Sequence, residues 1–189
     1  MVGVKRCIIM AWLGVYLTFT SHANADNSSS YCVTADDKKF CEKVVQGAAD
    51  WNQAMCMAIS EAMKHITSIT NSDYRAMIHR SKSATLGKTI DSLCHHSYSN
   101  TRERLKESLE LARSGDKYSS LNLKLSSALT SLEDCSSVFF DLKYDYSSLM
   151  KMNRDLNHCI RVCLAVDKSK ALEEKQKATQ AALTTYFEV

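Results

Sequence analysis

Residues 94–135 read CHHSYSNTRERLKESLELARSGDKYSSLNLKLSSALTSLEDC, and this stretch decides the fold. Two helical patterns lie between its terminal cysteines, separated by the turn Ser114-Gly115-Asp116. Gly115 is placed for a left-handed cap at the end of the first helix, and Asp116 or Ser114 can cap the start of the second. The stretch therefore predicts two antiparallel helices joined by a short turn.

The second of these helices carries the clearest amphipathic pattern in the chain. Apolar residues recur at alternating spacings of three and four, which places them on one helical face. These residues are Tyr118, Leu121, Leu125, Ala128, Leu132, Cys135 and Phe139. Similar stripes cover residues 48–69, 98–112 and 149–166, and a weaker one from Met77 to Leu93 is interrupted near Gly87. The chain has no proline and no convincing alternating strand pattern, so we predict an all-α, up-down four-helix bundle.

The N-terminus has the composition of a secretory signal peptide. Lys5 and Arg6 precede an apolar run at residues 7–19, and Ala23-Asn24-Ala25 follows as a small-residue cleavage site. Removal of residues 1–25 takes away no acidic residue, so the net charge falls from +3 to +1. A charge this small lacks the basic excess of a nucleic-acid-binding protein.

We therefore divide the chain into three parts. Residues 1–25 are the signal peptide, residues 26–167 the bundle domain, and residues 168–189 a charged tail that is helical or disordered. No second apolar run is long enough to span a membrane, so we expect an exported protein outside the membrane. Asn27 starts the sequon Asn27-Ser28-Ser29, which makes it a candidate glycosylation site.

Nothing in the sequence predicts catalysis or metal binding. His95 and His96 follow Cys94 directly, so helical geometry points the three side chains in different directions rather than at one tetrahedral ion. The chain also lacks the glycine-rich turn that presents a nucleophile in hydrolases. We expect a protein that is not an enzyme and that needs no cofactor.

Several motifs together resemble one family. Two cysteine pairs are separated by nine and by forty-one residues, and the motifs between the second pair include a tyrosine four residues after its first cysteine. The matching residues are Cys32 and Cys41, Cys94 and Tyr98, Ser114-Gly115-Asp116, Ser126-Ser127-Ala128-Leu129-Thr130 and Cys135. Over residues 32–166 the chain resembles the plant inhibitors of pectin methylesterase and invertase.

The resemblance implies a fold and a mode of action. It implies a four-helix bundle with a short N-terminal helical hairpin, stapled by disulfides Cys32–Cys41 and Cys94–Cys135. It also implies a protein secreted to the plant apoplast and cell wall that docks its bundle over the substrate cleft of a carbohydrate-active enzyme. On the same grounds the candidate partner contacts are Tyr98, Glu103, Asp116, Lys117, Tyr118 and Thr130.

The target is read from the residues after the turn. Invertase inhibitors commonly show Pro-Lys-Phe there, whereas this chain has Lys117-Tyr118 and no proline. This difference favours pectin methylesterase, with invertase or a diverged, non-inhibitory interaction module as the alternatives.

The remaining cysteines leave two readings open. Seven cysteines follow the signal peptide, so at least one has no partner within the chain. The first and last helices of an up-down bundle are neighbours, which lets Cys56 reach Cys159 or Cys163. We predict a third disulfide, Cys56–Cys163, with buried free thiols as the alternative.

Overall fold

The computed structural model describes residues 30–72, 74–79, 84–116, 120–140 and 146–187. The predicted signal peptide, the sequon at Asn27 and the candidate contacts Lys117 and Tyr118 lie outside these ranges. Within these ranges the regular elements are helices: α3 (Lys38–Val45), α4 (Trp51–Asn71), α5 (Tyr74–His79), α6 (Ala84–Ser114), α7 (Ser120–Phe140) and α8 (Ser147–Phe187).

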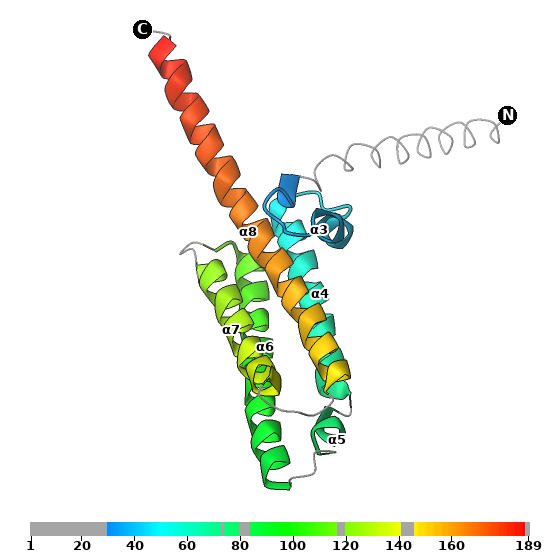
Figure 1. The fold of residues 1–189 in the computed structure, drawn as a ribbon. Coiled ribbons are helices and arrows are strands. Elements are labelled where there is room, and N and C mark those ends of the chain that lie inside the picture. Colours follow the sequence, from blue (N-terminus) through cyan, green and yellow to red (C-terminus); the bar gives the residue numbers. More distant parts are fainter. Residues whose placement is uncertain (1–29, 73, 80–83, 117–119, 141–145, 188–189) are drawn as a thin grey trace, which may run out of the picture.

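Four of these helices form an antiparallel bundle (Figure 1). Helix α6 packs against α4 and α7, and α8 packs against α7 and α4, so the order around the bundle is α4, α6, α7, α8. The side formed by α7 and α8 therefore lies opposite the side formed by α4 and α6. This arrangement confirms the predicted all-α four-helix bundle.

The long helices begin and end where the sequence supplies capping groups. The Asp50 carboxylate accepts a hydrogen bond from the Gln53 amide N–H at 2.7 Å, and the Gln53 side chain accepts one from the Ala49 N–H at 2.7 Å. Such reciprocal bonds satisfy the free N–H groups at a helix start. Gly115 ends α6 with φ of 76°, and the Asp116 carboxylate accepts from the Leu121 N–H at 2.7 Å in the first turn of α7. Both predicted roles in this turn are confirmed.

The core consists of the apolar stripes that the sequence predicts. On α7 every described member of the stripe is no more than 3% exposed: Leu121, Leu125, Ala128, Leu132, Cys135 and Phe139. Burial of one such leucine contributes about 1.5–3 kcal/mol. The stripe therefore fixes which face of α7 turns inward.

The predicted interruption near Gly87 is wrong. Helix α6 begins at Ala84 and continues through Gly87 without a break. A glycine within a helix costs about 1 kcal/mol relative to alanine. The same helix buries Ile90 and Cys94 completely or nearly so, and this packing outweighs the local preference.

The segment before α4 is fastened to the bundle. The Cys32–Cys41 disulfide joins it to α3, with the two Cα atoms 5.8 Å apart. The Thr34 hydroxyl donates to the Ala165 carbonyl of α8 at 2.8 Å. The Phe40 ring stacks on His158 of α8, with ring centroids 4.4 Å apart. These contacts hold the N-terminal segment against α8.

The third disulfide does not form in the structure. Cys56, Cys159 and Cys163 are free thiols. The Cys163 thiol points along its own helix and donates to the Cys159 carbonyl at 3.3 Å, whereas Cys56 is only half-buried on α4. The prediction of a Cys56–Cys163 bond is thus corrected to buried or half-buried thiols.

Helix α8 continues beyond the bundle. Residues 171–180 are all exposed, and the helix projects past the neighbouring helices as far as Phe187 (Figure 1). The tail after residue 167 is therefore helical over its described part. None of the described helices has both the length and the apolar composition needed to cross a membrane.

Candidate docking surface

The α6–α7 hairpin presents some of the predicted contact residues to solvent. Glu103 on α6 and Thr130 on α7 are exposed, and Asp116 in the connecting turn is half-buried. Asp116 is already engaged in capping α7. Of these three, Glu103 and Thr130 are exposed to a partner, with the Thr130 hydroxyl donating to the Ser126 carbonyl at 3.2 Å.

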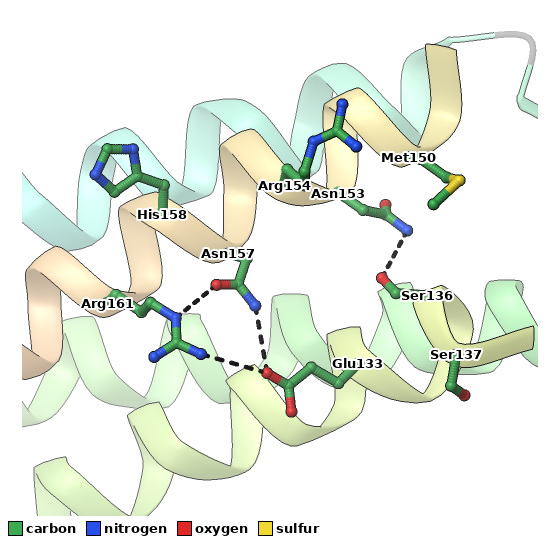
Figure 2. A pocket seen from close by; sticks show the side chains of 9 residues that line it. All are labelled: Glu133, Ser136, Ser137, Met150, Asn153, Arg154, Asn157, His158 and Arg161. Carbon is green, nitrogen blue, oxygen red and sulfur yellow. Dashed lines mark hydrogen bonds and ion pairs between the residues drawn. The ribbon is translucent and has the colours of Figure 1, made fainter. Parts of the chain in front are cut away.

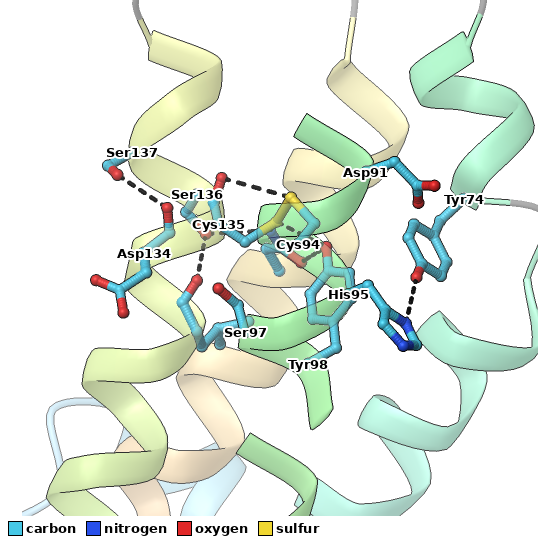
Figure 3. The surroundings of a disulfide bond; sticks show 12 residues. Tyr74, Asp91, Cys94, His95, Ser97, Tyr98, Asp134, Cys135, Ser136 and Ser137 are labelled. Atoms are coloured by element: carbon cyan, nitrogen blue, oxygen red, sulfur yellow. Dashed lines mark hydrogen bonds between the residues drawn. A yellow bond between two sulfur atoms is a disulfide. The ribbon is translucent and has the colours of Figure 1, made fainter. Parts of the chain in front are cut away.

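Tyr98 is not available, and its proposed role as a partner contact is corrected. Its side chain is 1% exposed, and its hydroxyl donates to the Asn153 side-chain oxygen of α8 at 2.9 Å. Burial raises the pKa of the Tyr98 phenol, so the group stays protonated. It lies beside the Cys94–Cys135 disulfide, which links α6 to α7 with Cα atoms 4.7 Å apart (Figure 3). Tyr98 therefore braces the hairpin from inside.

The outer face of α7 carries an exposed apolar residue that the sequence analysis missed. Leu123 is 67% exposed, whereas Leu121 and Leu125 on either side are buried. Thr130 follows Leu123 by seven residues, which is two helical turns, so the two share one face. The signal was present in the sequence, because Leu123 falls outside the spacing of the buried stripe. An exposed leucine among polar side chains is suited to anchoring a protein partner.

A groove adjoins this face between α7 and α8 (Figure 2). Its volume is about 760 Å³, and residues of both helices line it: Glu133, Ser136, Ser137, Met150, Asn153, Arg154, Asn157, His158 and Arg161. Glu133 lies one turn after Thr130 on α7, so the outer face of α7 and the groove form one continuous surface. We call the two together the α7–α8 surface.

Hydrogen bonds hold one wall of the groove in place. Asn157 accepts from Arg161 Nε at 2.8 Å and donates to Glu133 at 3.4 Å (Figure 2). The Arg161 guanidinium lies 3.8 Å from the Glu133 carboxylate. Both partners of this ion pair are 52% exposed, so solvent screens it and its own contribution to stability is small. The ion pair instead keeps the Arg161 and Glu133 side chains in position across the boundary between α7 and α8.

The charge of the groove is positive. Arg161 forms an ion pair with Glu133, whereas Arg154 has no carboxylate within ion-pair distance among the described residues. Surfaces with unpaired cations steer and orient partners that carry acidic groups. The α7–α8 surface thus combines an apolar anchor, adaptable polar groups and a cationic edge.

The turn end of the bundle is braced rather than open. Asn122 donates to the Asp167 carboxylate at 3.0 Å, joining α7 to α8. Burial raises the pKa of Asp167. The Trp51 indole donates to the Val166 carbonyl at 3.0 Å, and the Lys170 ammonium lies 4.0 Å from the Trp51 ring centroid. Each contact crosses between helices, so this end fixes the geometry of the surface beside it.

Across the described ranges, no three histidine, cysteine, aspartate or glutamate side chains are grouped so that they could hold a metal ion.

Comparison with known proteins identifies the fold. A family model described as "Plant invertase/pectin methylesterase inhibitor" matches residues 26–166. No curated protein sequence gives a match.

Two solved structures are similar to this chain. One is a mutant form of a pectin methylesterase inhibitor from Arabidopsis, with a TM-score of 0.62 and 19% sequence identity; the match covers 75% of this chain and 95% of that one. The other is a pectin methylesterase inhibitor from Arabidopsis thaliana, with a TM-score of 0.56 and 18% identity, covering 76% and 95%. At these identities the structures establish the fold.

The family model covers well over half of the chain, and the matched region holds α4, α6 and α7, the part of α8 up to Val166, and both disulfides. Proteins of this family are inhibitors of cell-wall enzymes rather than enzymes. The chain belongs to the plant invertase/pectin methylesterase inhibitor family.

Proposed function

We propose that this protein is an extracellular inhibitor of pectin methylesterase that docks its α7–α8 surface over the enzyme's substrate cleft. The observation that carries the proposal is the exposed Leu123, which stands on a helix held rigid by the Cys94–Cys135 disulfide. Rigid presentation lowers the entropy lost on association. A partner that covers Leu123 would also meet Thr130 and the cationic edge of the groove.

The choice of target follows from the turn sequence. Gly115-Asp116 is followed by Lys117 and Tyr118, without the proline that invertase inhibitors commonly carry there. Two solved structures that are similar to this chain are both pectin methylesterase inhibitors, which supports the same choice. The predicted signal peptide supports an extracellular location, where such enzymes act on the cell wall.

Replacement of the anchor tests the docking surface. We expect Leu123→Arg to raise the inhibition constant for pectin methylesterase by about 30-fold, because a central interface anchor contributes about 2 kcal/mol or more. Leu183→Arg is the matched control: Leu183 is 55% exposed and lies on the projecting end of α8. It should inhibit like the unmodified protein, and both variants should keep the same melting temperature.

Two results would contradict this location of the docking surface. Equal inhibition by the Leu123 and Leu183 variants would place the docking surface elsewhere on the bundle. Loss of inhibition by Glu103→Ala with Leu123→Arg unaffected would move it to the outer face of α6.

A further inference from the structure

A second pocket lies on the side of the bundle opposite the α7–α8 surface. It has a volume of about 410 Å³ and is bounded by the end of α4, by α5 and by α6. Small-molecule sites usually have volumes of about 300–1,000 Å³ with a few convergent polar groups. The docking of an enzyme on α7 and α8 makes no use of this pocket.

Two arginines give the pocket a positive charge. The Arg102 guanidinium donates to the Thr70 hydroxyl and, within the described part of the chain, faces no carboxylate at ion-pair distance. Arg75 lies 3.3 Å from the Asp91 carboxylate, yet its side chain remains 54% exposed. One cation is therefore unpaired and the other is only partly neutralised. A guanidinium binds carboxylates through two parallel N–H donors.

His95 adds a third group to this cluster. Its Nδ1 atom lies 3.2 Å from Arg75 Nη2 and 3.4 Å from the Tyr74 hydroxyl, and the imidazole points toward Tyr74 (Figure 3). Both neighbours are donors, so this geometry suits a neutral imidazole that accepts at Nδ1. The charged groups that face His95 are Arg75 on α5 and Asp91 on α6, with Arg102 lining the same pocket.

The rest of the lining indicates what kind of anion fits. The Thr70 and Ser72 hydroxyls line the pocket but already donate to carbonyls of α4. The Ser99 hydroxyl and the Asn71 amide line it as well and make no side-chain hydrogen bond to another described residue. These two groups can pair with the hydroxyls of a sugar, whereas a bare inorganic anion would leave them without a ligand contact. The charged and uncharged polar groups are thus matched by a molecule that bears one carboxylate and several hydroxyls.

We propose that the pocket formed by α4, α5 and α6 binds a uronic acid sugar, with its carboxylate held by Arg75 and Arg102. The site is separate from the α7–α8 surface and does not depend on enzyme inhibition.

Isothermal titration calorimetry on the mature chain tests the site without any enzyme. The probes are trigalacturonate, the neutral trisaccharide galactotriose and inorganic phosphate. We expect trigalacturonate to bind several-fold more tightly than galactotriose or phosphate. Arg102→Gln should weaken the binding of trigalacturonate about tenfold, because it removes the unpaired cation.

Arg154→Gln is the matched control, since it deletes an unpaired arginine from the opposite side of the bundle. Binding of galactotriose as tight as that of trigalacturonate would overturn the charge argument. Phosphate binding as tight as trigalacturonate would overturn the sugar assignment. Equal losses in the Arg102 and Arg154 variants, or no binding of trigalacturonate at millimolar concentration, would overturn the site.

Discussion

At the scale of single residues, Tyr98 shows how one side chain supports the inner face of the hairpin. Its hydroxyl reaches Asn153 on α8, and the Asn153 amide in turn donates to Ser136 on α7 at 3.1 Å. The chain of contacts joins α6, α8 and α7 around the Cys94–Cys135 disulfide. A buried polar group without its partner is costly, so such a network is sensitive to the loss of one atom.

Tyr98→Phe should therefore lower the free energy of unfolding by about 1–2 kcal/mol, because Asn153 loses its donor. Urea denaturation monitored by circular dichroism measures the change. Tyr31→Phe is the matched control, since Tyr31 is also buried but makes no hydrogen bond through its hydroxyl to the described residues. Equal destabilisation by both variants would show that the Tyr98 hydroxyl has no special role.

The buried thiols give a second prediction at this scale. Burial raises the pKa of Cys159 to about 12 and raises that of Cys163 further. At about pH 8 the reactive thiolate is then almost absent in the folded state. A thiol-specific reagent should modify no more than one cysteine, Cys56, in the folded mature protein and three after denaturation. One modified cysteine after denaturation would instead demonstrate the third disulfide.

The raised pKa values of Cys159 and Cys163 also make the stability of the fold depend on pH. An unfolded cysteine ionises above about pH 8.5, while the folded thiols remain protonated. The unfolded state thus binds fewer protons in this range. The contribution of the two buried thiols to the free energy of unfolding is therefore fully present below about pH 8.5. It is lost progressively as the pH rises toward 12.

At the scale of elements, the two disulfides differ in what they close. All four cysteines are fully buried, but the bonds span nine and forty-one residues. In the chain-entropy model the longer loop contributes about 4 kcal/mol and the shorter one about 2.5 kcal/mol. We expect the double variant Cys94→Ala/Cys135→Ala to lose more stability than Cys32→Ala/Cys41→Ala in guanidinium denaturation. The reverse order would show that native packing at the N-terminal segment outweighs loop closure.

The projecting end of α8 makes a separate prediction. Residues 177–181 and 183 are exposed, and an ion pair joins Lys177 to Glu173 within the helix. A helical end of this length has little stability of its own in water. Deletion of residues 177–189 should reduce the helical circular dichroism signal and change the free energy of unfolding by less than about 0.5 kcal/mol. Deletion from Val166 onward is the control, and it should destabilise strongly because Val166 is fully buried.

Helices were the part of the structure that sequence patterns predicted best. The spacing of three and four residues predicts α7 correctly because every described residue of its stripe faces the core. The predicted interruption near Gly87 is absent, because a local preference of about 1 kcal/mol is smaller than the packing energy of the helix around it. Local capping at Gly115 and Asp116 was predictable because it depends on neighbouring residues alone.

At the scale of the whole molecule, the docking surface is assembled by packing between helices. Glu133 and Arg161 are far apart in the sequence and meet only because α7 lies beside α8. Periodicity assigns a residue to a face of its own helix but does not give the neighbour of that face. This is why the groove could not be predicted. The expectation that Tyr98 contacts a partner came from the family resemblance, whereas its position on the apolar stripe of residues 98–112 agrees with the burial that the structure shows.

Inhibition of pectin methylesterase is the central claim, and a titration of activity tests it most directly. Correctly folded mature protein is added in increasing amounts to a plant pectin methylesterase and, in parallel, to a plant invertase at mildly acidic pH. The account predicts that pectin methylesterase activity falls to near zero at a slight molar excess of the protein while invertase keeps its activity. Full pectin methylesterase activity at a large excess would contradict the inhibitor function, and inhibition of invertase alone would contradict the choice of target.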